Sequence, residues 1–83
     1  MRGGPEMEGK VAIVTGGANG LGRGMVELLV AEGARVVIAD LDRADGEALA
    51  EALGAGAAFK QTDVADADQI QAVVDFAVEH FGG

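Results

Sequence analysis

Residues 10–24 read KVAIVTGGANGLGRG, an apolar run that passes directly into a glycine-rich turn. The run Val11–Val14 is continuous rather than alternating, as in a parallel strand that is buried on both faces. From Leu21 the apolar residues recur at helical spacing, and Gly33 follows the last of them. The expected buried face of this helix consists of Leu21, Met25, Leu28 and Leu29. The segment therefore predicts a strand, a tight turn and a helix, in that order.

The same alternation continues along the rest of the chain. Val36–Ala39 is a second apolar run that ends at Asp40, and Ala57–Gln61 is a third, weaker one. Asp42 is placed to cap the second helix, and Asp66 with Gln69 resembles the capping box of a third. The expected buried positions are Ala48, Leu49, Ala52 and Leu53 in the second helix, and Ile70, Val73, Val74, Ala77 and Phe81 in the third.

Strands that are joined by helices must run parallel, with right-handed crossovers and helices on the sheet faces. The prediction is therefore an α/β fold, the β-α-β-α-β-α half of a Rossmann-type parallel sheet, with strand order 3-2-1. Residues 1–8 are expected to form a flexible leader. Residues 9–83 are expected to form this half domain.

The composition limits the classes of function. The chain of 83 residues has 6 Lys+Arg against 14 Asp+Glu, a formal charge of −8 that argues against nucleic acid or an anionic membrane surface as a partner. Cys is absent, which excludes disulfides and thiolate metal sites. No apolar run approaches the length of a membrane span, and the leader lacks the apolar core of a signal peptide. We therefore expect a cytoplasmic protein.

The glycine turn is suited to binding the pyrophosphate of a dinucleotide, because free N–H groups at a helix N-terminus attract an anion. Gly16 is expected to make the sharp turn out of the strand, and Gly20 to lie against the pyrophosphate. Gly22 is expected to let the helix pack closely on the first strand. The alternative is a glycine-rich turn that binds nothing, but the flanking strand and helix favour the binding interpretation.

Asp40 ends the second predicted strand, 18 residues after Gly22. This is close to the roughly 20-residue spacing of the acid that binds the adenosine ribose in dinucleotide folds. A carboxylate there accepts hydrogen bonds from the ribose hydroxyls and repels a 2′-phosphate, so NAD is favoured over NADP. The alternative role of capping the next helix is better filled by Asp42.

Lys10–Gly24, Asp40 and the pair Asp63-Val64 together resemble the short-chain dehydrogenase/reductase family. Its nucleotide motif, Thr-Gly-x-x-x-Gly-x-Gly, begins here at Thr15, and the resemblance extends from about Glu8 to Gly83. It implies that residues 9–83 form the amino-terminal part of an NAD(P)-binding Rossmann domain. It also implies that Asp63 accepts a hydrogen bond from the adenine amino group and that Val64 contacts the ring. NADP-preferring members often carry a basic residue where this chain has Asn19. The residues expected to bind the cofactor are Thr15, Gly16, Gly17, Asn19, Gly20, Leu21, Gly22, Asp40, Leu41, Asp63 and Val64.

The resemblance implies an oxidoreductase that transfers hydride between NAD and an alcohol or ketone, with full-length members usually homo-oligomeric. The family's catalysts are a Tyr, a Lys, a Ser and an Asn, with the Tyr exchanging a proton with the substrate oxygen. This chain contains no Tyr and no Ser. We therefore assign no catalytic residue and no metal ligand, and expect the chain to be inactive alone. His80 and the helix carboxylates are expected at the surface.

Three interpretations stay open at this point. The chain is the amino-terminal segment of such an oxidoreductase, a stand-alone nucleotide-binding or regulatory module, or a methyltransferase-type domain. The motif spacing and Asp63-Val64 argue against the third. Without a fourth strand, Val11–Val14 is expected to be an uncovered edge, with apolar side chains such as Phe76 or Phe81 in water. The isolated chain is then expected to be poorly stable and to self-associate.

Overall fold

The computed structural model describes residues 8–82 and confirms the predicted alternation of strands and helices. The predicted leader lies outside these residues except for Glu8. In chain order the elements are β1 (Val11–Thr15), α1 (Gly20–Ala31), β2 (Arg35–Asp40), α2 (Arg43–Leu53), the short 3-10 helix η2 (Gly54–Gly56), β3 (Ala57–Gln61) and α3 (Ala67–Phe81).

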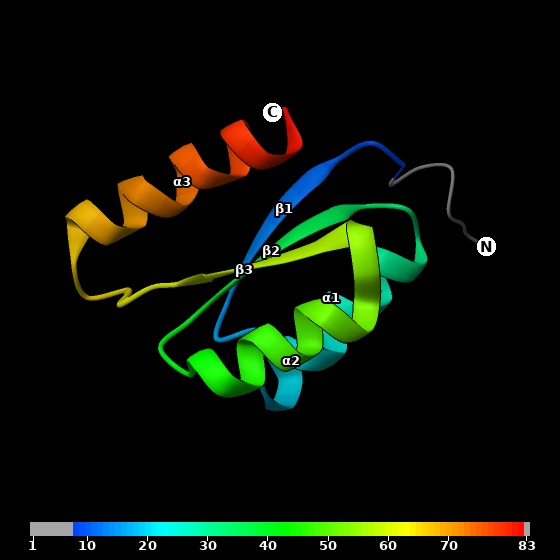
Figure 1. Cartoon of the computed structure of the whole chain (residues 1–83), viewed down its shortest axis with the longest axis horizontal. Coiled ribbons are helices and arrows are strands. Elements are labelled where there is room, and N and C mark those ends of the chain that lie inside the picture. Colours follow the sequence, from blue (N-terminus) through cyan, green and yellow to red (C-terminus); the bar gives the residue numbers. More distant parts are fainter. Residues whose placement is uncertain (1–7, 83) are drawn as a thin grey trace.

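The three strands form one parallel sheet in the order β1-β2-β3, which confirms the predicted order 3-2-1. In the register of this sheet, Val11 lies beside Arg35 and Val36 lies beside Ala57. Helices α1 and α2 cover one face of the sheet, and α3 covers the other (Figure 1). The central strand β2 is therefore buried on both sides, which explains its unbroken apolar run.

Alternate residues of β2 face two separate cores. Val36 and Ile38 pack in a cluster with Val26 of α1 and Leu49 of α2. Val37 and Ala39 point to the opposite face, where they pack with Val73 and Ala77 of α3. All four β2 side chains are fully buried, so this strand fixes the positions of the helices on both faces.

The predicted buried face of α1 is right for Leu29, which is half-buried, and wrong for the other three residues. Val26 has no exposed surface, and Leu29 packs beside it, whereas Leu21 is 95% exposed. Met25 and Leu28 are also exposed. The reason is Gly22, which lies on the same side as Val26 and allows close contact with the turn after β1. A glycine contributes nothing to an apolar pattern, so the pattern favoured the neighbouring face.

The predicted face of α2 is right for Leu49, which is buried, and for Leu53, which packs against the same core, but wrong for Ala48 and Ala52, which are exposed. The buried residue that the apolar pattern missed is Gly46. Again a glycine decides, because a Cβ at Gly46 would overlap the ring of Phe59 on β3. The helix turns the one residue without a side chain toward the bulkiest residue of the strand.

In α3 the predicted face is right for Val73, Ala77 and the half-buried Phe81. It is wrong for Ile70 and Val74, which are exposed. Phe76 and Phe81 are half-buried against the core, so the expectation that they lie in water is also wrong. The outer apolar side chains of α3 are instead Ile70, Val74 and Val78.

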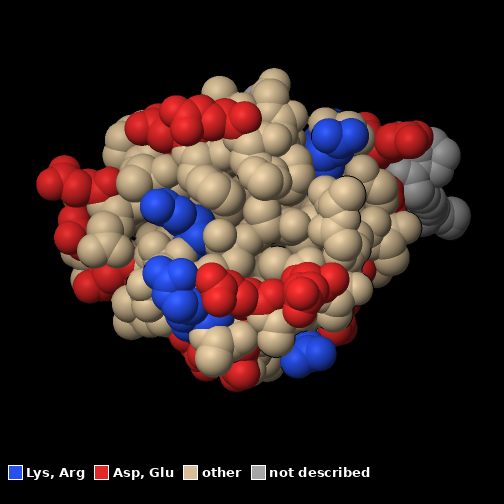
Figure 2. Space-filling view, in the orientation of Figure 1, with Lys and Arg blue, Asp and Glu red and all other residues tan. Residues whose placement is uncertain are grey.

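Strand β1 is an edge of the sheet within residues 8–82, as predicted, and its Ile13 is 37% exposed. Acidic side chains gather over α2 and α3 on the face shown in Figure 2, with few Lys and Arg between them. The helix carboxylates predicted at the surface are exposed, namely Glu47, Glu51, Asp66, Asp68, Asp75 and Glu79. Among the described residues, no helix is long and apolar enough to cross a membrane.

Candidate cofactor site

The predicted site residues lie at one edge of the sheet, in the turns that follow the three strands (Figure 1). Parallel strands end at the same edge, so residues far apart in sequence become neighbours there. The turn after β1 contacts Asp40 at the end of β2. On the other side of Asp40, its carbonyl oxygen accepts a hydrogen bond from the N–H of Thr62, 3.0 Å away, just after β3.

The backbone of the glycine turn requires glycine at two positions. Gly16 has φ +66° and Gly20 has φ +61°, the left-handed region that residues with a Cβ rarely adopt. The N–H of Gly16 donates to the carbonyl oxygen of Ala39, 2.8 Å away, which ties the turn to the central strand. A Cβ at Gly20 would meet open space, so this position presents bare backbone at the surface.

Gly17 and Gly22 are needed for close packing instead. A Cβ at Gly22 would overlap the carbonyl oxygen of Gly16 and lie 2.8 Å from its carbonyl carbon. The close contact of α1 is therefore with the turn rather than with the strand itself. A Cβ at Gly17 would lie 3.0 Å from the carbonyl oxygen of Val14 and 3.1 Å from a methyl group of Val26.

The N-terminus of α1 has no side-chain cap, unlike those of α2 and α3. Asp42 accepts from the N–H of Asp45, and Asp66 accepts from those of Asp68 and Gln69, which confirms both predicted caps. At α1 the capping position is Asn19, whose side chain makes no capping hydrogen bond, and the first turn carries no acid. The first N–H groups of an α-helix have no partner within the helix. Those of α1 therefore remain available to an anion.

Asp40 joins the glycine turn to the loop after β2. Its Oδ2 accepts from the N–H of Ala18 at 3.1 Å, and its Oδ1 accepts from the N–H of Asp42 at 2.9 Å. Each carboxylate oxygen has two lone pairs, so both oxygens can still accept a further hydrogen bond. Asp40 is thus both a structural link and a free acceptor at this edge.

The remaining predicted residues form the rim of the site. Val64 and Leu41 are 52% and 62% exposed, and Leu21 protrudes almost entirely into solvent. Asp63 has a turn role as well, because its Oδ1 accepts from the N–H of Ala65 at 2.9 Å. Its own N–H donates to Oε1 of Gln69 at 2.8 Å. Gln69 therefore reaches beyond Asp66 to the candidate adenine-binding residue, unlike in a standard capping box.

Sequence reasoning missed two residues of this arrangement. Ala18 is fully buried, and its N–H is the link from the turn to Asp40. Asp42 was predicted only as a helix cap, but its Oδ2 also accepts from Nδ2 of Asn19, 3.3 Å away. No local signal reveals either contact, because the partners lie 22 and 23 residues apart in the chain.

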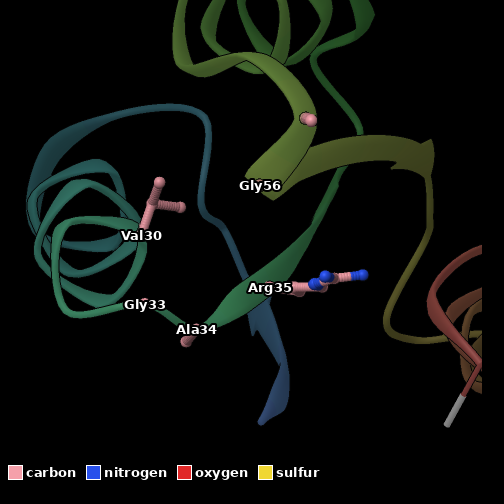
Figure 3. A pocket seen from close by; sticks show the side chains of 6 residues that line it. Val30, Gly33, Ala34, Arg35 and Gly56 are labelled. Carbon is pink, nitrogen blue, oxygen red and sulfur yellow. The ribbon is translucent and has the colours of Figure 1, made fainter. Parts of the chain in front are cut away.

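A hollow of about 320 Å³ lies at the opposite edge of the sheet, where β2 and β3 begin (Figure 3). Val30, Ala34 and Gly56 line it, and the Arg35 side chain points away from Val30. It adjoins the carboxyl end of α1, where the helix dipole disfavours an anion. The hollow is therefore separate from the candidate cofactor site.

Other reactive groups are sparse. His80 is exposed, as predicted, and stacks on Phe76 with ring centroids 5.3 Å apart. Within residues 8–82 no group of three or more acidic or histidine side chains is close enough to hold a metal ion.

Several known proteins resemble this chain over almost all of its length. The sex determination protein tasselseed-2 of Zea mays is 53% identical over 77 residues, which are 93% of this chain and 23% of that protein. The (+)-borneol dehydrogenase 1 of Salvia officinalis is 48% identical over 93% of this chain and 30% of its own length. The chain thus spans about a quarter to a third of these relatives.

Solved structures also resemble this chain over almost all of its length. A short-chain dehydrogenase/reductase described as a glucose/ribitol dehydrogenase from Brucella melitensis superposes with a TM-score of 0.90 at 36% identity, covering 100% of this chain and 35% of that one. A 3-ketoacyl-(acyl-carrier-protein) reductase from the same organism, complexed with NADH, gives a TM-score of 0.88 at 38% identity, covering 92% of this chain and 31% of its own. A model of the family described as "short chain dehydrogenase" matches residues 10–83. This decides against a methyltransferase-type domain: the chain belongs to the short-chain dehydrogenase family and forms the amino-terminal, nucleotide-binding part of its fold.

Proposed function

We propose that this chain provides the NAD-binding part of an oxidoreductase that transfers hydride between NAD and an alcohol or ketone. The main observation behind the proposal is that the N-terminus of α1 has no side-chain cap. It follows directly on the glycine turn, which is hydrogen-bonded to the Asp40 carboxylate. Relatives complexed with NAD or NADH support it. NAD supplies the hydride acceptor when it is bound, and this chain's own residues bind and orient it.

The pyrophosphate would be held by the backbone at the start of α1. The N–H groups there have no side-chain cap, and the helix dipole adds a positive potential. Gly20 leaves open space where a side chain would obstruct a ligand. The residues of the turn fit such an anion in both shape and charge.

The adenosine ribose would be held by Asp40. Its two oxygens each accept one backbone N–H and keep capacity for the two ribose hydroxyls. A 2′-phosphate at the same position would face this carboxylate, which favours NAD over NADP. The exposed Leu41 and the pair Asp63-Val64 lie along the same edge, where the adenine ring would rest.

The proton transfer of the reaction would need a residue that this chain does not contain, since it has no Tyr. The chain's contribution to the reaction is therefore cofactor affinity and selectivity. The alcohol or ketone substrate and the homo-oligomer that is usual in the family are proposed only for a full-length form of the protein. The cytoplasm, the expected location, is consistent with a requirement for NAD.

Calorimetric titration of the chain with NAD and NADP tests the proposal. We expect NAD to bind at least about tenfold more tightly, a difference of roughly 1.4 kcal/mol from one unfavourable charge contact. Asp40→Asn should narrow the gap while keeping one acceptor for the Ala18 N–H. Asp75→Asn on the outer surface of α3 removes the same charge and should leave the ratio unchanged. Equal affinities for the two cofactors in the unsubstituted chain would refute the assignment of Asp40.

A stand-alone nucleotide-binding or regulatory module is the second candidate. The motif and the free helix N-terminus fit it equally well, because neither depends on catalysis. A monomeric 83-residue chain that unfolds cooperatively and binds NAD at micromolar concentration would favour the module. An open reading frame downstream that encodes the Tyr and Lys of the family's catalytic set would favour the oxidoreductase.

A further inference from the structure

Asp42 connects three parts of the candidate cofactor site. Its N–H donates to Oδ1 of Asp40 at 2.9 Å, and its own Oδ1 accepts from the N–H of Asp45 at 3.0 Å. Its Oδ2 accepts from Nδ2 of Asn19 at 3.3 Å. One residue thus links the start of α2, the proposed ribose-binding acid and the glycine turn, through its backbone N–H and both of its carboxylate oxygens.

Asn19 occupies the capping position of α1 without capping it. Its backbone is extended, with φ −142° and ψ 162°, as an N-cap residue requires. Asn is among the residues most favoured as a helix cap, because its side-chain oxygen accepts from the second or third N–H of the helix. In this chain the Asn19 amide is directed to Asp42 instead, and no cap forms.

A capped α1 would compete with the cofactor. The N–H groups that an Asn19 cap would occupy belong to the same first turn that would receive the pyrophosphate. Asp42 holds the Asn19 amide through Oδ2, and an ionised carboxylate can only accept hydrogen bonds. The N–H of Asp45, and to a smaller extent the Asn19 amide, hold the pKa of the Asp42 carboxyl below its ordinary value.

We propose that Asp42 is a positioning residue for the cofactor: by accepting the Asn19 amide, it keeps that side chain from capping α1 and so keeps the pyrophosphate-binding N–H groups free. This inference rests on the proposed function. The residue that caps α2 would thereby affect cofactor binding at the N-terminus of α1.

Asp42→Ser is the decisive variant. Ser can still cap α2 through its hydroxyl, but it lacks the second oxygen that accepts from the Asn19 amide. Released from Asp42, the Asn19 side chain should cap α1, and NAD affinity should fall about fivefold, the effect of one N-cap hydrogen bond. Glu51→Gln removes the same charge from the exposed side of α2 and should not lower NAD affinity.

The double variant separates positioning from any direct effect. In an Asn19→Ala background no side chain can cap α1, so Asp42→Ser should no longer weaken NAD binding measured by calorimetry. A fivefold loss that persists in this background would overturn the proposal, as would an Asp42→Ser affinity equal to that of Glu51→Gln.

Amide hydrogen exchange without cofactor gives a readout that does not depend on NAD binding. Asp42→Ser should slow exchange of the Leu21 or Gly22 N–H, and the further change Asn19→Ala should restore it. Failure of the unsubstituted chain to bind NAD would refute the proposed function, whereas unchanged exchange in Asp42→Ser would refute this inference by itself.

Discussion

Replacing Gly22 and Gly24 by Ala should have opposite effects on stability, although both residues belong to α1. At Gly24 a Cβ would meet open space, so the substitution should stabilise the chain by about 0.5–1 kcal/mol, the difference in helix propensity between Ala and Gly. At Gly22 the same gain is opposed by overlap with backbone atoms of Gly16 and Gly17. Both substitutions add one methyl group to the same helix, so they differ only in the atoms that surround that group.

The magnitude at Gly22 follows from what the new methyl group would meet. Its contacts are backbone atoms, and the turn is anchored by the hydrogen bond from Gly16 to Ala39. Overpacking costs typically about 1–3 kcal/mol, and a rigid neighbour places the cost near the upper end. After the propensity gain, Gly22→Ala should destabilise the chain by about 2 kcal/mol. For a domain of this size, that lowers the unfolding midpoint by about 10 °C.

Thermal and urea unfolding followed by circular dichroism at the helix band would measure both effects. We expect Gly22→Ala to unfold at a lower temperature than the unsubstituted chain, and Gly24→Ala at a slightly higher one. NAD affinity should fall only in Gly22→Ala, because only there does the turn have to move. If both variants shifted the midpoint in the same direction, the close contact between α1 and the turn would be refuted.

Gly46→Ala should cost about 1–3 kcal/mol because the methyl group would overlap the Phe59 ring, and adding Phe59→Leu should recover part of the loss in urea unfolding. Ile13→Lys should reduce self-association in sedimentation velocity, since a charge on an edge strand discourages pairing, whereas Gln71→Lys on α3 should not. The Asp42 cap should stabilise the fold fully above the ordinary carboxyl pKa of about 3.9 and lose its effect as the pH falls through the lower pKa of the folded state. Asp42→Ser should therefore flatten the acid limb of a plot of unfolding midpoint against pH.

The elements of the fold were predictable because their signals are local. A continuous apolar run such as Val36–Ala39 can be satisfied only by burial on both faces, and a capping acid such as Asp42 marks where a helix begins. Glycines at 16 and 20 mark backbone that must adopt positive φ. The parallel sheet, its strand order and the edge that gathers the candidate site follow from the order of these elements.

The tertiary structure alone decided the exact orientation of α1 and α2 on the sheet and the hydrogen bonds that link the site. An apolar pattern counts side chains, but α1 and α2 approach the sheet through Gly22 and Gly46, where the absence of a side chain allows the contact. The hydrogen bonds of Asp40 with Ala18 and of Asp42 with Asn19 join segments more than 20 residues apart. Close packing and long-range hydrogen bonds depend on distances between segments, and those distances exist only once the chain has folded.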